Sequence, residues 1–94
     1  MYMRITRGQF ELSRMDESIA ISQEIGDAIA RLPGFVRYHG GINRNTGAIV
    51  AVSVWDTEAH ASGVRDTLGG LIARLQAVGA HLQAPDVFEI VVDR

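Results

Sequence analysis

The stretch Ala48-Ile49-Val50-Ala51-Val52-Ser53-Val54-Trp55 is the longest run of apolar, β-branched residues in the chain, and it ends at the only tryptophan. A strand with one face in water alternates polar and apolar residues, because successive side chains point to opposite faces. This run is apolar at both parities apart from Ser53, which predicts a strand covered on both faces. We therefore expect two different layers of protein to pack against it.

The residues before this strand predict a strand, a helix and a second strand. Residues 2–11 are rich in β-formers, and Ser13 is a candidate N-cap for a helix that ends at Pro33-Gly34. Residues 35–43 then predict a strand that pairs antiparallel with 48–55, because the intervening segment 43–47 is rich in turn formers. The apolar face of the helix recurs at steps of three and four, at Ile21, Ile25, Ala28, Ile29 and Leu32.

The residues after Trp55 predict a second helical region and a final strand. Asp56 or Thr57 is expected to cap a helix that Gly63 interrupts. A longer helical stretch follows, which Pro85 is expected to end before a strand over residues 87–92. The apolar positions of this stretch are Leu68, Leu71, Ile72, Leu75, Val78 and Leu82.

The resulting order β-α-β-β-α-β predicts an α+β fold of the ferredoxin-like kind, as a single domain over residues 1–94. Both β-α-β connections should be right-handed crossovers, which places both helices on one face of a four-stranded antiparallel sheet. The other face then has no cover within the chain, although 48–55 is apolar on both faces. A second copy packed sheet to sheet is the simplest cover, so we expect a homodimer that forms an α+β barrel.

The composition argues against several classes of function. The net charge of −2 gives no support to nucleic-acid binding, and the absence of cysteine excludes disulfides, thiolate metal sites and a thiol nucleophile. No apolar run reaches the length of a membrane span, so no membrane partner is expected and a cytoplasmic location is the default expectation. The three histidines lack metal-ligand spacing, and no glycine-rich phosphate loop follows a strand. We expect neither a metal nor a cofactor.

Two segments together resemble a known family. Leu32-Pro33-Gly34-Phe35 leads into a strand, and the apolar strand ends in Trp55-Asp56-Thr57-Glu58-Ala59. This pattern resembles the antibiotic-biosynthesis-monooxygenase-like family of dimeric α+β barrels. The family includes oxygenases of polyketide phenols that need no metal or flavin, and haem-degrading enzymes.

The resemblance implies a pocket between the sheet and the helices of one subunit. In the oxygenases, a tryptophan, an asparagine and other polar groups hold a phenolate there that itself reacts with oxygen, and Trp55 matches the position of that tryptophan. The haem-degrading members also use an Asn on the first strand and a His on the second helix. The first strand of this chain has no Asn, and the expected His falls at Gly63 or Val64. Both departures argue against haem degradation.

Three residues are candidates for the site: Trp55, Arg37 and His39. The indole of Trp55 could stack on an aromatic ligand, or it could simply be a core residue at the end of a strand. Arg37 and His39 fall on one face of their strand and Tyr38 on the other. The imidazole could deprotonate a phenol while the guanidinium holds the anion. Alternatively, the pair is a polar strand edge near the hairpin or the dimer interface.

The leading hypothesis is a homodimer that binds an aromatic or polyketide-like molecule and acts as a cofactor-independent monooxygenase. The alternative is a non-catalytic ligand-binding or stress-response assembly protein. A third hypothesis is haem binding or degradation. An enclosed cavity beside Trp55 with two or more polar side chains would favour an enzyme or ligand-binding protein over a purely assembling one.

Overall fold

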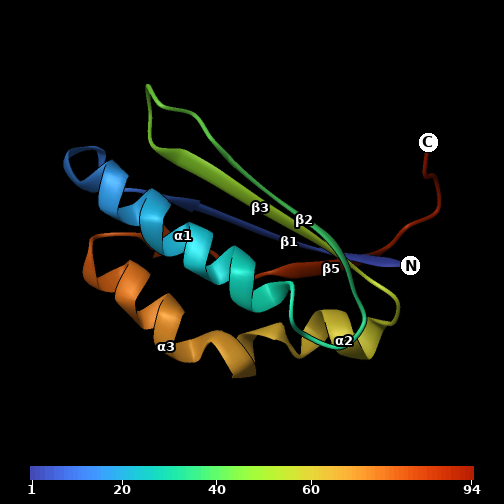
Figure 1. Ribbon diagram of the computed structural model, residues 1–94. Coiled ribbons are helices and arrows are strands. Elements are labelled where there is room, and N and C mark those ends of the chain that lie inside the picture. The colour runs from blue at the N-terminus through green and yellow to red at the C-terminus, as the bar shows by residue number, and fades with distance from the viewer.

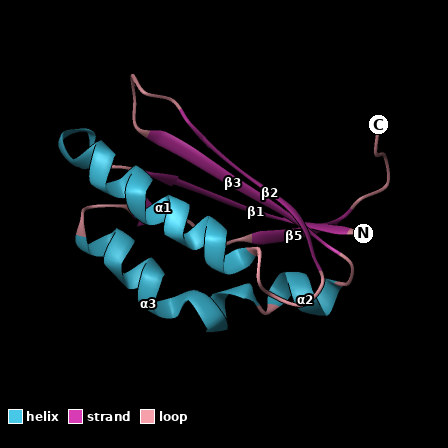
Figure 2. Cartoon of the chain, viewed as in Figure 1, coloured by secondary structure: helices cyan, strands magenta, loops and turns pink.

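The computed structural model describes residues 1–94 and consists of an antiparallel sheet with its helices on one face (Figures 1 and 2). This confirms the α+β, ferredoxin-like prediction. The strands are β1 (Tyr2–Gln9), β2 (Phe35–Ile42), β3 (Ala48–Trp55), β4 (His81–Leu82) and β5 (Asp86–Glu89). The helices are a 3₁₀ turn η1 (Leu12–Arg14), α1 (Met15–Ile29), α2 (Glu58–Ser62) and α3 (Val64–Ala77).

The sheet has the order β2-β3-β1, and both β4 and β5 pair with the remaining edge of β1. β4 pairs with the end of β1 at Gly8, and β5 pairs with its beginning at Tyr2. The two short strands thus form one edge strand with an interruption, and Pro85 lies in that interruption. Proline has no backbone N–H to donate to a ladder, which accounts for the break. The predicted fourth strand is therefore present in two pieces.

The end of the long helix differs from the prediction. α3 ends at Ala77, well before Pro85, and His81 and Leu82 belong to β4. The stop is Gly79, which has a φ of +95°, while the Gly79 N–H donates to the Gln76 carbonyl. A left-handed residue of this kind is a common helix end. Leu82 continues the helical spacing by coincidence, because from its strand it also packs against the core.

Other boundaries also differ from the prediction, since α1 ends at Ile29, before Pro33-Gly34. The first strand ends at Gln9, and the last ends at Glu89. α1 begins at Met15, because Ser13 lies within the 3₁₀ turn η1 and does not cap the helix. By contrast, Thr57 caps α2 as predicted, since its hydroxyl accepts a hydrogen bond from the His60 N–H over 3.2 Å.

The core lies between the helices and one face of the sheet. Helices α1 and α3 lie side by side beneath the strands in Figure 1. The pairing register assigns alternate residues of each strand to this helix-covered face, and the intervening residues to the open face that no helix covers (Figure 2). The core residues are Phe10, Ile21, Ile25, Ile29, Trp55, Ala61, Val64, Leu68, Leu75 and Ala80.

The open face retains apolar side chains that this chain does not cover. Val50 of β3 is 39% exposed and Phe88 of β5 is 43% exposed. Register places Val50, Val52 and Val54 on this face, and Ile49, Ala51 and Ser53 on the helix-covered face. β3 is thus covered on one face by its own helices, while on its other face Val50 stays 39% exposed and Val54 is only 6% exposed. None of the helices has the length and apolar character needed to cross a bilayer.

Candidate ligand-binding site

Three adjoining cavities lie between the helices and the sheet. The hairpin cavity, about 280 Å³, lies under α1 near the β2–β3 hairpin, and the central cavity, about 90 Å³, lies between both helices and the sheet. The outer cavity, about 240 Å³, lies between α3, β1 and the segment that joins β4 to β5. The hairpin and central cavities share Ser22, Tyr38, Ile49 and Ala51, while the central and outer cavities share Arg4, Thr6, Ile72 and Leu82.

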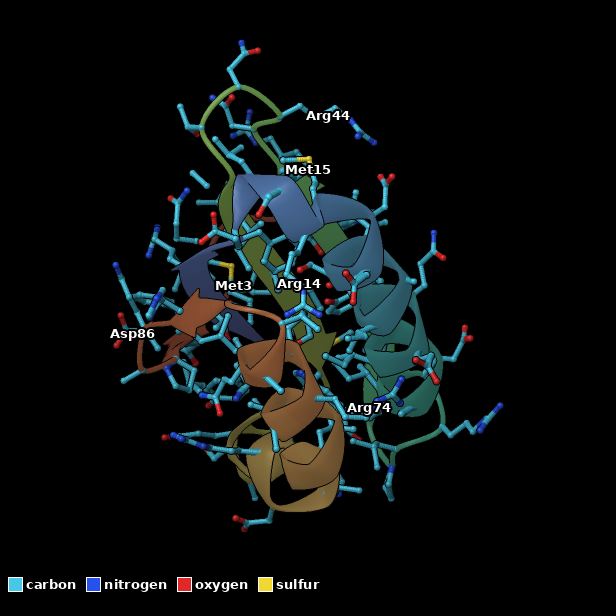
Figure 3. All side chains as sticks on the ribbon, turned by 90° about the vertical axis from the view of Figure 1, so that its left-hand side faces the viewer. Met3, Arg14, Met15, Arg44, Arg74 and Asp86 are labelled. Atoms are coloured by element: carbon cyan, nitrogen blue, oxygen red, sulfur yellow. The ribbon has the colours of Figure 1, made fainter.

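The lining of the hairpin and central cavities is mostly apolar, as is usual for a ligand pocket with a few polar groups. Arg44 lies at the hairpin end, and Figure 3 shows its side chain extending from the hairpin toward the side on which α1 lies. Arg65 lies at the opposite end, in the outer cavity. Polar side chains between these ends come from β1, β2, β3 and α1, and they are Arg4, Thr6, Ser22, Tyr38 and Ser53.

Three of these residues form a polar row across the sheet, namely Arg4 of β1, Ser53 of β3 and Tyr38 of β2. The register pairs Ser53 with Arg4 on one side and with Tyr38 on the other. Adjacent strands are about 4.8 Å apart, so a guanidinium, a hydroxyl and a phenol follow one another along a line perpendicular to the strands. The polar row lies on the helix-covered face, beneath α1 and α3.

Arg4 is the chemically distinctive member of the polar row. Its side-chain hydrogen bond goes to the Thr6 hydroxyl over 3.5 Å, and it makes no ion pair with any carboxylate. Burial lowers the pKa of Arg4 below its ordinary value, the charge of Arg65 lowers it further, and Tyr38 partly opposes this. A partly desolvated cation without a counter-ion favours the binding of an anion.

Tyr38 is placed by close packing against α1. The Tyr38 ring lies against Gly26 of α1, where an added Cβ would be 3.4 Å from the ring, at van der Waals contact. Burial raises the pKa of the Tyr38 hydroxyl above its ordinary value, and the charge of Arg4 partly offsets the effect. Tyr38 therefore keeps its proton at neutral pH and can donate a hydrogen bond to a ligand.

Trp55 lies next to the polar row, on the same face of the sheet as Ser53, and does not line these cavities. It is completely buried, and its indole N–H donates to the Ser53 hydroxyl over 2.8 Å. Phe35 packs edge-on against it, with ring centroids 5.9 Å apart and an interplanar angle of 80°. The indole thus has its hydrogen bond within the protein, and its effect on a ligand would pass through Ser53.

Arg37 and His39 lie on the open face, on the other side of the sheet from Tyr38. Register pairs Arg37 with Val54 and His39 with Val52, both of which point away from the helices. Arg37 makes an exposed contact with Asp93 over 3.4 Å. The sheet therefore separates these two residues from Trp55, and the three predicted site residues do not meet in one cavity.

The cavities contain neither a histidine, the common protein ligand of haem iron, nor a side chain that transfers protons near neutral pH, although Tyr38 is of a type that ligates iron in some haem proteins. Their linings include no histidine and no carboxylate. His60 lies on the surface, where its Nδ1 is 2.7 Å from Asp56. Nowhere in the chain do three His, Asp or Glu side chains gather in a metal-binding arrangement. The residues present therefore do not fit a haem site of the His-ligated type.

The sequence analysis did not identify Arg4 or Ser53 as site residues. It placed Tyr38 on the face opposite Arg37 and His39 and did not include it in the site. Two signals could have found them. Ser53 is the single polar residue in an apolar strand, and the hairpin over 43–47 implies the pairing of Ser53 with Tyr38. Arg4 could be added only with the register of β1 against β3, which no local signal supplies.

Solved structures with this fold include oxygenases. A variant of SnoaB, a cofactor-independent oxygenase from Streptomyces nogalater, is 19% identical, with a TM-score of 0.83 over 98% of this chain and 94% of that one. A candidate antibiotic biosynthesis monooxygenase from Deinococcus radiodurans is 13% identical, with a TM-score of 0.85 over 100% and 96% of the two chains.

A conserved protein from Methanosarcina mazei Go1 has the same fold, at 11% identity and a TM-score of 0.77 over 94% of this chain and 91% of that one. No protein-family model matches this chain, and no curated protein is similar to it in sequence. The fold predicted from the resemblance to antibiotic-biosynthesis-monooxygenase-like proteins is confirmed. At these identities the likeness is one of fold.

Proposed function

We propose that this chain, which shares the fold of antibiotic-biosynthesis-monooxygenase-like proteins, binds an aromatic, polyketide-like phenol in the cavities beneath α1 and α3 and oxidises it with O₂ without a cofactor. The observation that carries the proposal is the Arg4 guanidinium, which lies in a largely apolar pocket without a carboxylate partner. An ionised phenol or enol supplies the negative charge that this cation lacks. Tyr38 can donate a hydrogen bond to the same oxygen.

In the proposed reaction the ionised substrate itself reduces O₂, and the protein binds and orients it. Binding beside Arg4 lowers the pKa of an acidic phenol, whose proton passes to solvent because no lining side chain is a base at neutral pH. The resulting carbanion-like ring reduces O₂. For an anthrone-type substrate, the balanced reaction converts a ring CH₂ and O₂ into a ring C=O and water. The protein supplies orientation and a fixed positive charge where the anion forms.

Oxygen uptake with 1,8-dihydroxyanthrone tests this function. We expect Arg4→Gln to lower turnover by about 100-fold, as removal of a positioned charge does in other enzymes, and Arg4→Lys to retain part of it. Tyr38→Phe should lower turnover less, because it removes one hydrogen bond. Catalysed oxygen uptake that is unchanged in Arg4→Gln would exclude the polar row as the site.

The same assay tests the three residues predicted from the sequence. We expect Trp55→Phe to reduce turnover through its loss of support for Ser53. Arg37 and His39 could reach a substrate only if a partner subunit closes a second cavity over the open face. His39→Ala and Arg37→Gln are therefore the decisive variants for that prediction, and a fall in turnover comparable to that of Arg4→Gln would support it.

A binding role without turnover is the second candidate, favoured by the absence of a general base from the cavities. Quenching of Trp55 fluorescence by the anthrone with no oxygen consumption would support it, since Trp55 is the only tryptophan and contacts Ser53.

We also propose that residues 1–94 act as one domain and that two copies associate through the open face. The exposed Val50 and Phe88 support this, together with the half-buried Ile5 and Val52 that register places on the same face. Burial of these side chains against a second copy would give β3 cover on both faces.

A further inference from the structure

The outer cavity differs from the other two because its lining is mainly polar and cationic. Arg65, the second residue of α3, shares it with Arg4, and the amides of Gln76 and Gln83 complete its polar wall. Neither arginine makes an ion pair, whereas Arg14, Arg37 and Arg74 all do. Two cations and two amides thus line one space of about 240 Å³ without any acidic side chain, and of these four residues Arg4 is half-buried and the other three are exposed.

The position of Arg65 does not stabilise its own helix. A helix carries a partial positive charge at its N-terminal end, where acidic residues are favoured and a cation is unfavourable. Arg65 also lies close enough to Arg4 for the two charges to interact, which contributes to the lowered pKa of Arg4. An anion in the outer cavity would relieve the repulsion between Arg65 and Arg4, because both guanidinium groups line the same space.

We propose that the outer cavity is an acid-group subsite, in which Arg65 holds a carboxylate or similar anionic group carried by the aromatic ligand, and Arg4 lies between this group and the phenol. The proposal rests on the proposed function, and it narrows the ligand class to aromatic acids. The rings would extend from Arg65 past Arg4 toward Tyr38, because the outer and central cavities share Arg4 and Thr6. A phenol at the far end of the same molecule would then reach the polar row.

A matched set of naphthalenes tests the subsite. Binding of 2-naphthol and of 6-hydroxy-2-naphthoate is measured by calorimetry at low and high salt. We expect the naphthoate to bind about tenfold more tightly, since hydrogen bonds to charged groups are stronger than those between neutral groups. Arg65→Gln should reduce this preference to about twofold or less and leave 2-naphthol binding unchanged, and Arg65→Lys should restore part of it. High salt should weaken the preference.

Arg31→Gln is the control, because Arg31 is exposed, makes no ion pair and lies outside the cavities described above. It should keep the full preference for naphthoate. In a further experiment, the melting temperature is measured with inorganic phosphate alone, for the wild type and for Arg65→Gln. If phosphate raises the melting temperature through Arg65 but the naphthoate has no advantage over 2-naphthol, the cavity takes a free anion and the aromatic-acid proposal is overturned.

The remaining outcomes separate this proposal from the proposed function. If 2-naphthol binds and quenches Trp55 but the naphthoate binds no better, the acid-group subsite fails while aromatic binding stands. If Arg65→Gln weakens both ligands equally, Arg65 has only a structural or general charge effect, and the subsite also fails. If neither compound binds, aromatic binding itself is wrong and the subsite fails with it.

Discussion

The hydrogen bond between Trp55 and Ser53 gives the sharpest stability prediction. The indole N–H and the serine hydroxyl are 2.8 Å apart, and the two residues are 0% and 3% exposed. Trp55→Phe removes the donor and leaves a buried hydroxyl with one fewer partner, at a cost of about 1–3 kcal/mol. The smaller ring also leaves roughly 40 Å³ unfilled, which at about 24 cal/mol per Å³ adds about 1 kcal/mol. We expect a total loss of about 2–4 kcal/mol.

The companion variant Ser53→Ala removes the acceptor and leaves the indole N–H without a partner, which should also cost about 1–3 kcal/mol. The double variant loses the same hydrogen bond only once. It should therefore be less destabilised than the sum of the two single variants by about 1–2 kcal/mol. Urea unfolding followed by far-ultraviolet circular dichroism measures these values, at one fixed protein concentration because association would also change the midpoint.

A matched control combines Trp55→Phe with Ser18→Ala. Ser18 is also fully buried, but its hydroxyl donates to the Arg14 carbonyl near the start of α1, away from Trp55. These two changes should be additive within about 0.5 kcal/mol. If Trp55→Phe and Ser53→Ala are equally additive, the hydrogen bond has no energetic weight and the account of Trp55 as a support for Ser53 is refuted.

Three further predictions concern the backbone, the open face and a surface pair. Gly8→Ala should destabilise the protein by about 1–3 kcal/mol in thermal unfolding, since its Cβ would lie 2.5 Å from the His81 carbonyl oxygen. Gly70→Ala is the control: Gly70 lies in α3 with open space around it, so the change should stabilise the protein by about 0.5–1 kcal/mol. Val50→Arg on the open face should convert a dimer to a monomer in light scattering at micromolar concentration. Asp56→Asn should lower the melting temperature near neutral pH, because the hydrogen bond from His60 lowers the pKa of Asp56.

The sign of the last effect follows from that lowered pKa. The carboxylate of Asp56 contributes stability above its unfolded pKa, and the contribution is lost as the pH falls through the lower folded pKa. The difference between Asp56→Asn and the wild type should therefore disappear in strong acid, and a difference that persists there would contradict the assignment. For the open face, Ala73→Arg on the exposed side of α3 is the control and should leave the mass unchanged. A dimer that survives Val50→Arg would contradict association through that face.

The features of this fold that could be predicted depend on short segments of the sequence. The apolar run 48–55, the turn formers at 43–47 and the cap at Thr57 each act over a few residues, and the structure has them where they were expected. The end of α3 was missed because Leu82 fits a helix and a strand equally, and the left-handed conformation of Gly79 determined the outcome. Local patterns cannot resolve a choice of that kind.

The candidate site was less predictable because it depends on register between distant strands. Arg4 and Tyr38 are far apart in sequence and meet only through Ser53, whose two neighbours are set by separate pairings. Parity correctly separated Tyr38 from Arg37 and His39. It could not say which of the two faces would hold the cavities, because that depends on the side to which both crossover helices return.

The position of β1 also constrains the order in which the sheet can form. Tyr2 pairs with Trp55 on one side and with Glu89 on the other, so β1 leaves the ribosome before either of these partner strands. Closing such long loops costs more entropy than closing a hairpin, so β2 and β3 can pair while β1 waits. A chain shortened before Asp86–Glu89 should therefore leave one edge of β1 unpaired and exposed to aggregation.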